Sequence, residues 1–275
     1  MKYYYFGIHK AASTWLIQIL YDINDFMNKK HAHYHSAKMF DHDINKMVYE
    51  KKLDFVSYTN SEYNTVQKIN HPFKAFHVIR DPRDIVASSY FSHLNTHSDN
   101  MWPELNDYRK ELKSLDKEEG IIATMNHLEN MRIDGEPVLV FDCLNNWNYD
   151  NPSILELKFE DITKYPYILI PEIFEFMGLL DSDSKQKSRN NFSESFLKFK
   201  KGTIDIKSLL YFIYKHDFYF KSGGRKKGEI SIDSHYRKGE SGDWKNHFSP
   251  RHVSYFKERY GDMLIKLGYE KDNNW

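Results

Sequence analysis

The segment HKAAST, residues 9–14, combines residue types that bind anions. Lys10 supplies a positive charge, Ser13 and Thr14 supply hydroxyl donors, and two alanines keep the loop small. It lies between a run of strand-forming aromatic residues and an apolar pattern with helical spacing. A short loop that opens a helix presents N–H groups and the positive end of the helix dipole to an anion. We therefore expect a phosphate- or sulfate-binding loop here; the alternative is an ordinary strand-to-helix turn.

The segment matches the phosphate loop of nucleotide kinases only in part. In the pattern G-x-x-x-x-G-K-[ST] the lysine follows the glycines and precedes the hydroxyl residue. In this chain Lys10 comes early, and Ala11 and Ala12 stand where glycines are expected. The residues alone therefore indicate an anion site without fixing the anion.

A second cationic turn lies in VIRDPRDIVASSYFSH, residues 78–93, where a predicted strand again leads into a helix. The guanidinium of Arg80 is a rigid fork that suits a phosphate group. Ser88 lies two helical turns further on and could offer its hydroxyl to the same group. The alternative is that Arg80 forms a structural ion pair with Asp81 or Asp84.

A third cationic turn, Arg237-Lys238-Gly239, lies in SHYRKGESGDWKNHFSP near the end of the chain. Lys+Arg and Asp+Glu both number 39, so the overall charge does not suggest binding to nucleic acid or to an anionic membrane. Three local cationic turns in one chain instead favour a small ligand with several negative charges.

These three stretches, in this order, resemble the sulfotransferases that use 3′-phosphoadenosine 5′-phosphosulfate (PAPS). The most specific stretch is RKGESGDWKNHF, which is similar to the C-terminal signature of that family. LELKFEDI at 155–162 resembles a strand and acidic turn in the family's second half. The resemblance extends from residue 3 to about residue 260. It implies PAPS as the co-substrate, adenosine 3′,5′-bisphosphate (PAP) as the product, a hydroxyl acceptor, and no required metal.

The resemblance also implies a role for each residue of the three turns. Lys10 would stabilise the leaving group during in-line transfer, and Trp15 would stack on adenine. Phe218 is the expected second aromatic residue at adenine, with Phe196 as the alternative. The 5′-phosphosulfate would be held by Lys10, Ser13, Thr14 and the backbone N–H groups of Ala11 and Ala12, and the 3′-phosphate by Arg80, Ser88, Arg237, Lys238 and Gly239.

The chain departs from the family where the general base is expected. The usual base is a histidine in a Thr-His pair just after the second strand, and counting back from Arg80 leads to Tyr58 instead. Glu62 is the better base at neutral pH, because an unperturbed tyrosine is almost wholly protonated. We expect Glu62 to be catalytic and Tyr58 to form a wall of the site, with His35, His77 or His93 as the next candidates. Phe159 stands where many members have a tyrosine.

Two other functions remain open on the sequence. One is a small-molecule kinase with a degenerate phosphate loop, and the other is a sulfotransferase-like protein that binds nucleotide without catalysis. The acceptor could be a small molecule, a glycan or a lipid hydroxyl, and the absent histidine favours a sugar or glycolipid. The sequence does not indicate an oligomeric state.

Histidines 31, 33 and 35 alternate in HAHYH, a pattern that could suit a metal. Nothing else nearby has ligand spacing, so we expect a polar loop between helices and no metal. The stretch KSGGRKK at 221–227 is expected to be a mobile lid over the site.

The elements that position these residues alternate between strand and helix. Strands are expected at 3–8, 53–58, 73–79 and 153–159, and helices at 13–24, 41–51, from 82, over 104–131 and at 170–179. This order predicts an α/β, three-layer, P-loop-like fold with a mainly parallel central sheet, as a single domain over 1–275. In parallel α/β sheets ligands bind at the carboxyl ends of the strands, so the first two turns should share one edge.

The single cysteine, Cys143, and the absence of a membrane-length apolar run indicate a soluble cytoplasmic protein without stable membrane insertion.

Overall fold

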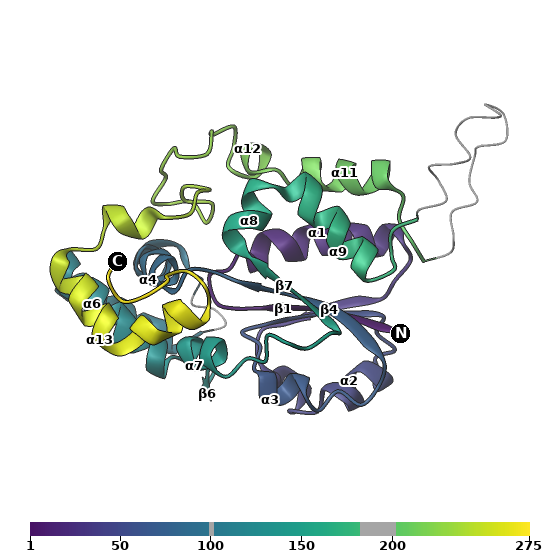
Figure 1. Ribbon diagram of the computed structural model, residues 1–275, viewed down its shortest axis with the longest axis horizontal. Coiled ribbons are helices and arrows are strands. Elements are labelled where there is room, and N and C mark those ends of the chain that lie inside the picture. The colour runs from purple at the N-terminus through teal and green to yellow at the C-terminus, as the bar shows by residue number, and fades with distance from the viewer. Residues whose placement is uncertain (99–101, 182–201) are drawn as a thin grey trace.

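A five-stranded parallel sheet forms the centre of the computed structural model, which describes residues 1–98, 102–181 and 202–275 (Figure 1). The strand order is β2-β3-β1-β4-β7, and every neighbouring pair is parallel. The strands are β1 (Lys2–Gly7), β2 (His31–Tyr34), β3 (Phe55–Thr59), β4 (Phe73–Ile79) and β7 (Ile154–Lys158), with a separate antiparallel pair β5 (Arg132–Ile133) and β6 (Glu136–Pro137).

Helices cover both faces of this sheet. In Figure 1, α1, α8, α9 and α11 lie on one face, α2 and α3 lie on the other, and α4, α6 and α13 gather at one end. The α-helices are α1 (Ser13–Phe26), α2 (Ile44–Glu50), α3 (Tyr63–Val66), α4 (Pro82–Phe91), α5 (Glu104–Ser114), α6 (Lys117–Asn130), α7 (Val140–Asn145), α8 (Phe159–Lys164), α9 (Pro166–Phe176), α11 (Ile206–Lys215), α12 (Phe218–Lys221) and α13 (Pro250–Lys266). Short 3₁₀ turns η1 (Ala37–Phe40) and η3 (Asp243–Asn246) and a π-helical turn η2 (Ser92–Thr96) complete the list.

The alternation of side chains along β1 shows why the sheet is buried on both faces. Tyr4 and Phe6 belong to the core under η1 and α2, whereas Tyr5 belongs to the core under α1. All three side chains are fully buried. A strand that is apolar on both faces requires a covering layer on each side. The predicted three-layer α/β fold with a parallel sheet is therefore confirmed.

The carboxyl ends of β1, β3 and β4 meet at one edge of the sheet. Gly7 is in register with Thr59 of β3 and with Val78 of β4. The loop that follows β1 and the turn that follows β4 at Arg80 therefore start side by side. The prediction that HKAAST and RDPRD share one edge is confirmed.

The prediction of a polar loop around HAHYH was wrong, because His31–Tyr34 forms strand β2 at the edge of the sheet. It pairs in parallel with β3, and His33 is in register with Ser57. An edge strand has one neighbour and tolerates polar side chains, and of its four residues only Tyr34 is buried. The histidines of this segment are therefore placed by a sheet.

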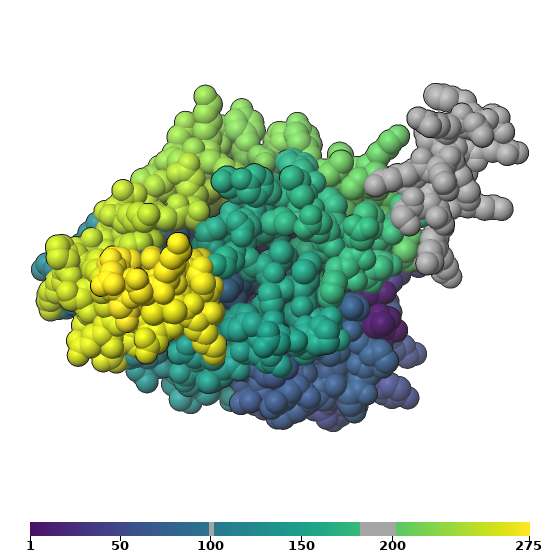
Figure 2. Space-filling view, in the orientation of Figure 1, coloured from purple at the N-terminus to yellow at the C-terminus, as the bar shows by residue number. Residues whose placement is uncertain are grey.

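The end of the chain closes one end of the molecule. In Figure 2 the yellow C-terminal residues lie against teal residues from the middle of the chain. Lys158 at the end of β7 donates a hydrogen bond to the carbonyl of Gly268, with Nζ–O 2.8 Å. Among the described helices, none is long and apolar enough to cross a membrane.

Candidate active site

A cavity of about 450 Å³ opens at the carboxyl edge of the sheet and brings all three cationic turns together. Eleven of the fourteen predicted site residues line it; Ala11, Tyr58 and Glu62 do not. The eleven are Lys10, Ala12, Ser13, Thr14, Trp15, Arg80, Ser88, Phe218, Arg237, Lys238 and Gly239.

The loop between β1 and α1 turns sharply through two left-handed residues. Lys10 and Ala12 both have φ of 63°, a conformation that costs energy in residues other than glycine. The first N–H groups of any α-helix have no intrahelical partner, and α1, which starts at Ser13, has no side-chain cap to satisfy them. The predicted donor Ala11 is different, since it is fully buried and its N–H donates to the carbonyl of Ile8 at 3.1 Å. The N–H group of Ala11 is therefore used within the loop, and the residues on either side of it, Lys10 and Ala12, line the cavity.

Lys10 carries an unusually acidic ammonium group. Burial, together with the positive charges of Arg80 and Arg237, lowers the pKa of Lys10 to about 7. Close cations favour the neutral amine, whereas an anion in the cavity favours the charged form. Binding of an anion in the cavity should therefore favour the protonated, charged form of Lys10.

Arg80 is held from two sides. One terminal nitrogen donates to the carbonyl of Lys10 at 2.9 Å, and the guanidinium lies 4.2 Å from the centre of the Phe159 ring. The Nε atom is buried and has no partner among the described residues. Phe159, at the position where the resemblance suggests a tyrosine, therefore supports Arg80 through its ring face.

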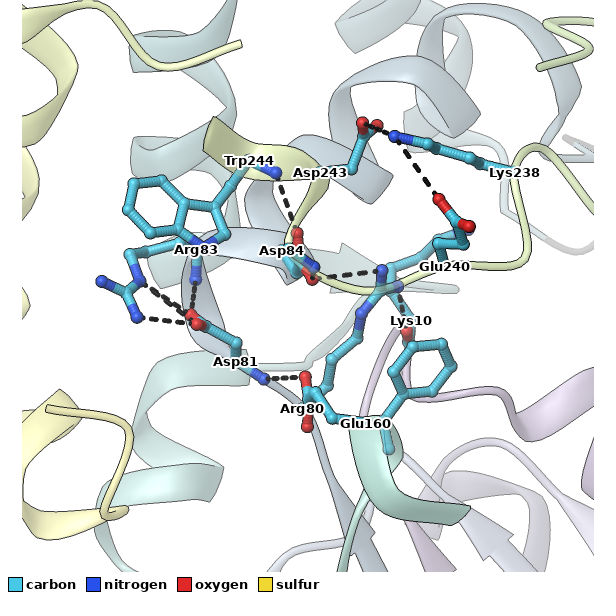
Figure 3. Close-up of polar contacts among 12 residues, drawn as sticks. Lys10, Arg80, Asp81, Arg83, Asp84, Glu160, Lys238, Glu240, Asp243 and Trp244 are labelled. Carbon is cyan, nitrogen blue, oxygen red and sulfur yellow. Dashed lines mark hydrogen bonds and ion pairs between the residues drawn. The ribbon is translucent and has the colours of Figure 1, made fainter. Parts of the chain in front are cut away.

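The alternative of a structural ion pair for Arg80 is confirmed with Asp84, although the pair is long. A terminal nitrogen of Arg80 lies 3.7 Å from the nearest oxygen of Asp84, and the same carboxylate accepts the N–H group of Trp244 at 2.9 Å (Figure 3). It also accepts the N–H group of Gly242 at 2.6 Å. Asp84 thus joins α4 to the third cationic turn.

The other arginine of RDPRD has a structural role. Arg83 pairs with Asp81, and its guanidinium lies 4.1 Å from the Trp244 ring centre (Figure 3). It also pairs with Glu270 near the end of the chain. Asp81 also caps α4 by accepting the N–H of Arg83. Arg80 thus lines the cavity, whereas Arg83 is used in structural contacts.

The cations of the third turn share one buried carboxylate. Asp243 accepts Nζ of Lys238 at 2.7 Å and a terminal nitrogen of Arg237. Burial alone would raise the pKa of Asp243, but hydrogen bonds from Lys238, Asn246 and Arg237 hold it well below its usual range. The carboxylate fixes both cations at the cavity wall, and it stays charged at neutral pH.

Two aromatic residues line the cavity from neighbouring segments. The indole N–H of Trp15 donates to the carbonyl of His216 at 2.8 Å, two residues before Phe218. Gly239 lies directly against the Phe218 ring, because a Cβ built there would be 2.5 Å from it. Trp15 and Phe218 therefore stay candidates for adenine contacts. Phe196, the alternative, lies outside the described residues.

The two residues predicted to act at the base position do not line the cavity. Tyr58 is buried, with its ring edge-on to Phe40. Glu62 precedes α3, and burial raises the pKa of its carboxyl. Thr59 and Asn60 line the cavity instead.

Asn60 was missed, although the sequence contains a signal for it. Thr59 ends β3 and Asn60 follows it, at the place where the resemblance suggests a Thr-His pair. The Asn60 side chain donates to the carbonyl of His35 at 3.0 Å, and its φ is 53°. An amide there cannot accept a proton as imidazole does.

Five histidines also line the cavity. Three of them, His9, His97 and His235, were not predicted as site residues from the sequence. Among the described residues no group of histidine, cysteine, aspartate or glutamate has an arrangement that could hold a metal ion. The five are His9, His33, His35, His97 and His235.

Comparison with known proteins shows the family. The model of the sulfotransferase domain matches residues 6–268. Mouse (Mus musculus) Sulfotransferase 2A6 is 27% identical over 195 residues, which cover 70% of this chain and 56% of that protein. The aligned region thus spans little more than half of that relative's length.

Two solved structures are similar in fold. Mouse sulfotransferase SULT7A1 complexed with PAP has a TM-score of 0.60 and 14% identity, over 96% of this chain and 84% of that one. Retinol dehydratase in complex with androsterone and inactive cofactor PAP has a TM-score of 0.51 and 15% identity, over 96% and 80%. Because the domain model covers nearly all of the sequence, this chain belongs to the sulfotransferase family.

Proposed function

We propose that this protein transfers a sulfuryl group from PAPS to a hydroxyl group of a small-molecule, glycan or lipid acceptor. The observation that carries the proposal is a single cavity lined by two anion-binding groups. One is the loop at 9–14 before α1, and the other combines Arg80 with Arg237 and Lys238. A donor with a 5′-phosphosulfate and a 3′-phosphate has two such anionic ends.

The cavity residues fit this donor by their chemistry. The start of α1 has unpaired N–H groups and no cap, and the Nε atom of Arg80 is buried without a partner among the described residues. When bound, PAPS supplies the activated sulfuryl group. Lys10 and the start of α1 would hold its 5′ end, and Arg80 with the third turn would hold its 3′-phosphate. Sulfuryl transfer, like phosphoryl transfer, depends mainly on positioning and charge stabilisation.

The lining also supports a polar acceptor. Besides the five histidines it includes Thr59, Asn60 and Ser98, which all carry hydrogen-bonding side chains. A site built to bind hydroxyl groups rejects molecules that lack them, because its buried polar groups would be left unpaired. We therefore expect sugar or glycolipid hydroxyls to be better acceptors than steroids or simple phenols.

The proposal is tested by binding and by transfer. Calorimetry should show PAP binding that is unchanged by EDTA, and labelled donor should modify hydroxyl acceptors from a library that contains sugars, phenols and steroids. A small-molecule kinase would instead transfer phosphate from ATP and stop in EDTA. A catalytically silent relative would bind PAP and label no acceptor, which would contradict the proposed transfer.

A further inference from the structure

The acceptor hydroxyl needs a base, and the predicted carboxylate Glu62 does not line the cavity. Neither do His77 and His93, which are fully buried. His77 pairs with Glu156 at 2.7 Å, on the face of the sheet that carries Trp147. The base must therefore be sought among the histidines that line the cavity.

His97 is a lining histidine whose surroundings leave the lone pair on Nε2, and Lys10 is among the charges that act on it. Its Nδ1 lies 3.0 Å from the carbonyl oxygen of Ser98. Since a carbonyl can only accept, Nδ1 carries the hydrogen, and in the neutral ring Nε2 carries the lone pair. Nε2 has no hydrogen-bond partner in the described part of the chain. This is the arrangement of a general base whose tautomer is set by a backbone carbonyl.

Two other lining histidines close to Lys10 use Nε2 in hydrogen bonds. The Nε2 of His9 lies 3.0 Å from that of His93, and the ring of His9 is buried. The Nε2 of His235 lies 2.9 Å from the hydroxyl of Thr14. These contacts occupy the nitrogen that a substrate would need.

The remaining two histidines lie at the end of β2 or just after it. The hydroxyl of Thr59 donates to the carbonyl of Tyr34, so it must accept from Nε2 of His33. The ring of His35 makes no hydrogen bond among the described residues, so nothing fixes its tautomer. Lys10 is among the charges that act on His97 but not among those that act on these two.

The backbone around His97 is held firmly. The π-helical turn η2 ends one residue earlier, and such turns recur at functional sites. Arg109 of α5 donates from Nε to the carbonyl of His93 at 2.7 Å and from a terminal nitrogen to that of His97 at 2.6 Å. The ring of Trp102 packs edge-on against His97, with centroids 5.1 Å apart. One arginine thus clamps both ends of the turn.

We propose that His97 is the general base of this protein and takes the place of the family's Thr-His histidine, where Asn60 stands. The inference rests on the proposed function. The hydroxyl proton of the acceptor passes to Nε2 of His97 as the acceptor oxygen forms its bond to sulfur. The bond from sulfur to the bridging phosphate oxygen breaks, and its electron pair leaves with the bisphosphate.

Charged neighbours make this base depend on the bound donor. The pKa of His97 is lowered to about 4, mainly by burial and then by the charge of Lys10. Arg109 and His35 contribute to the lowering, and the hydrogen bond to the Ser98 carbonyl acts against it. The other titratable groups around the ring are His9, His93 and His235. An anion beside Lys10 offsets the repulsion and raises the pKa of His97 towards neutrality. His97 therefore becomes an effective base only when the donor is in place.

The first test compares three variants by steady-state kinetics and PAP calorimetry. His97→Gln should lower kcat by about 10²–10⁴-fold, the usual contribution of a positioned base, and leave PAP affinity within about twofold. His42→Gln, an exposed histidine outside the cavity, should leave kcat unchanged. Glu62→Gln should also keep kcat. Near-normal kcat in His97→Gln, or a loss confined to Glu62→Gln, would overturn the inference.

The second test needs no turnover. Nitrogen-15 NMR of histidine-labelled protein should show a neutral His97 ring with hydrogen on Nδ1, assigned by its loss in His97→Gln. PAP should raise the pKa of that ring in the wild type, and by less in Lys10→Ala. A ring with hydrogen on Nε2 overturns the inference even if no acceptor is found. Absence of transfer by the wild type, together with the expected NMR signals, counts against the proposed function alone.

Discussion

Lys10 and Arg80 bring positive charge to the same cavity in different ways. An arginine side chain is a permanent cation, and that of Arg80 is fixed by the Lys10 carbonyl and the Phe159 ring. The ammonium of Lys10 is compact, partly buried and repelled by its neighbours, so its charge depends on pH and on the ligand. The permanent charge of Arg80 suits binding of the 3′-phosphate, and the ligand-dependent charge of Lys10 suits the 5′-phosphosulfate, where the reaction takes place.

The pH dependence of PAP binding should report this property of Lys10. The pKa of Lys10 is about 7 in the free protein, and a bound anion raises it. Affinity should therefore be greatest below pH 7 and fall as the pH rises through the free-protein pKa, by up to tenfold for each unit of the shift. Calorimetry between about pH 6.5 and pH 9 measures this fall. Lys10→Arg keeps the charge and should flatten it, while the titration of the phosphates is common to both proteins. An equally steep fall in the variant would contradict the assignment.

Arg80 should discriminate between ligands by their 3′-phosphate. Arg80→Gln should weaken PAP by about 1.5–3 kcal/mol, the usual value of a hydrogen bond to a charged group, which is roughly 10- to 150-fold. Adenosine 5′-phosphosulfate lacks the 3′-phosphate and should lose much less. Calorimetry with both ligands gives an internal control, because a general distortion of the cavity would weaken them equally. Equal losses would show that Arg80 does not bind the 3′-phosphate.

At the scale of elements, the parts that follow simple patterns were predictable from the sequence. The boundaries of β4 were predicted correctly, and α1 and β1 were predicted within two residues, because apolar residues mark them clearly. Strand β2 was missed because its histidines lack the apolar alternation by which strands are recognised. The base position depends on how the loop after β3 turns at Asn60, and a count along the sequence cannot give that geometry. Histidine 97 comes to the cavity through a π-helical turn, which has no clear sequence pattern.

The turn at 237–242 offers a matched pair of glycine substitutions. Gly239 and Gly242 both have positive φ, at 73° and 79°, so alanine strains the backbone at either position. A Cβ at Gly239 would also meet the Phe218 ring at 2.5 Å, whereas one at Gly242 meets nothing within 4 Å. Gly239→Ala should therefore weaken PAP binding, measured by calorimetry, by about tenfold more than Gly242→Ala, since overpacking typically costs about 1–3 kcal/mol. Equal affinities would remove Phe218 and its turn from the nucleotide site.

At the scale of the whole molecule, the cavity is closed by segments from opposite ends of the chain. The loop after β1 and the turn before η3 are separated by more than two hundred residues, and both line it. Asp84 of α4, with 1% of its surface exposed, links the sheet edge to the second of these segments (Figure 3). Ligand binding and the closure of the C-terminal segment onto the sheet should therefore be coupled.

Asp84→Asn tests this coupling. The carboxylate accepts two backbone N–H groups, from Gly242 and Trp244, whereas an amide must turn its own NH₂ group towards one of them. The free energy of unfolding in urea should fall by about 1–3 kcal/mol, the cost of leaving a buried polar group unsatisfied. PAP affinity should fall as well, because the cations of the third turn lose their anchor to α4. Excess PAP should restore part of the stability, since a ligand that binds only the folded state stabilises it by mass action. Asp107→Asn, at an exposed carboxylate on α5, is the control and should change neither quantity. If Asp84→Asn loses stability but binds PAP normally, the C-terminal segment is held by other contacts and the two ends of the chain are not coupled through α4.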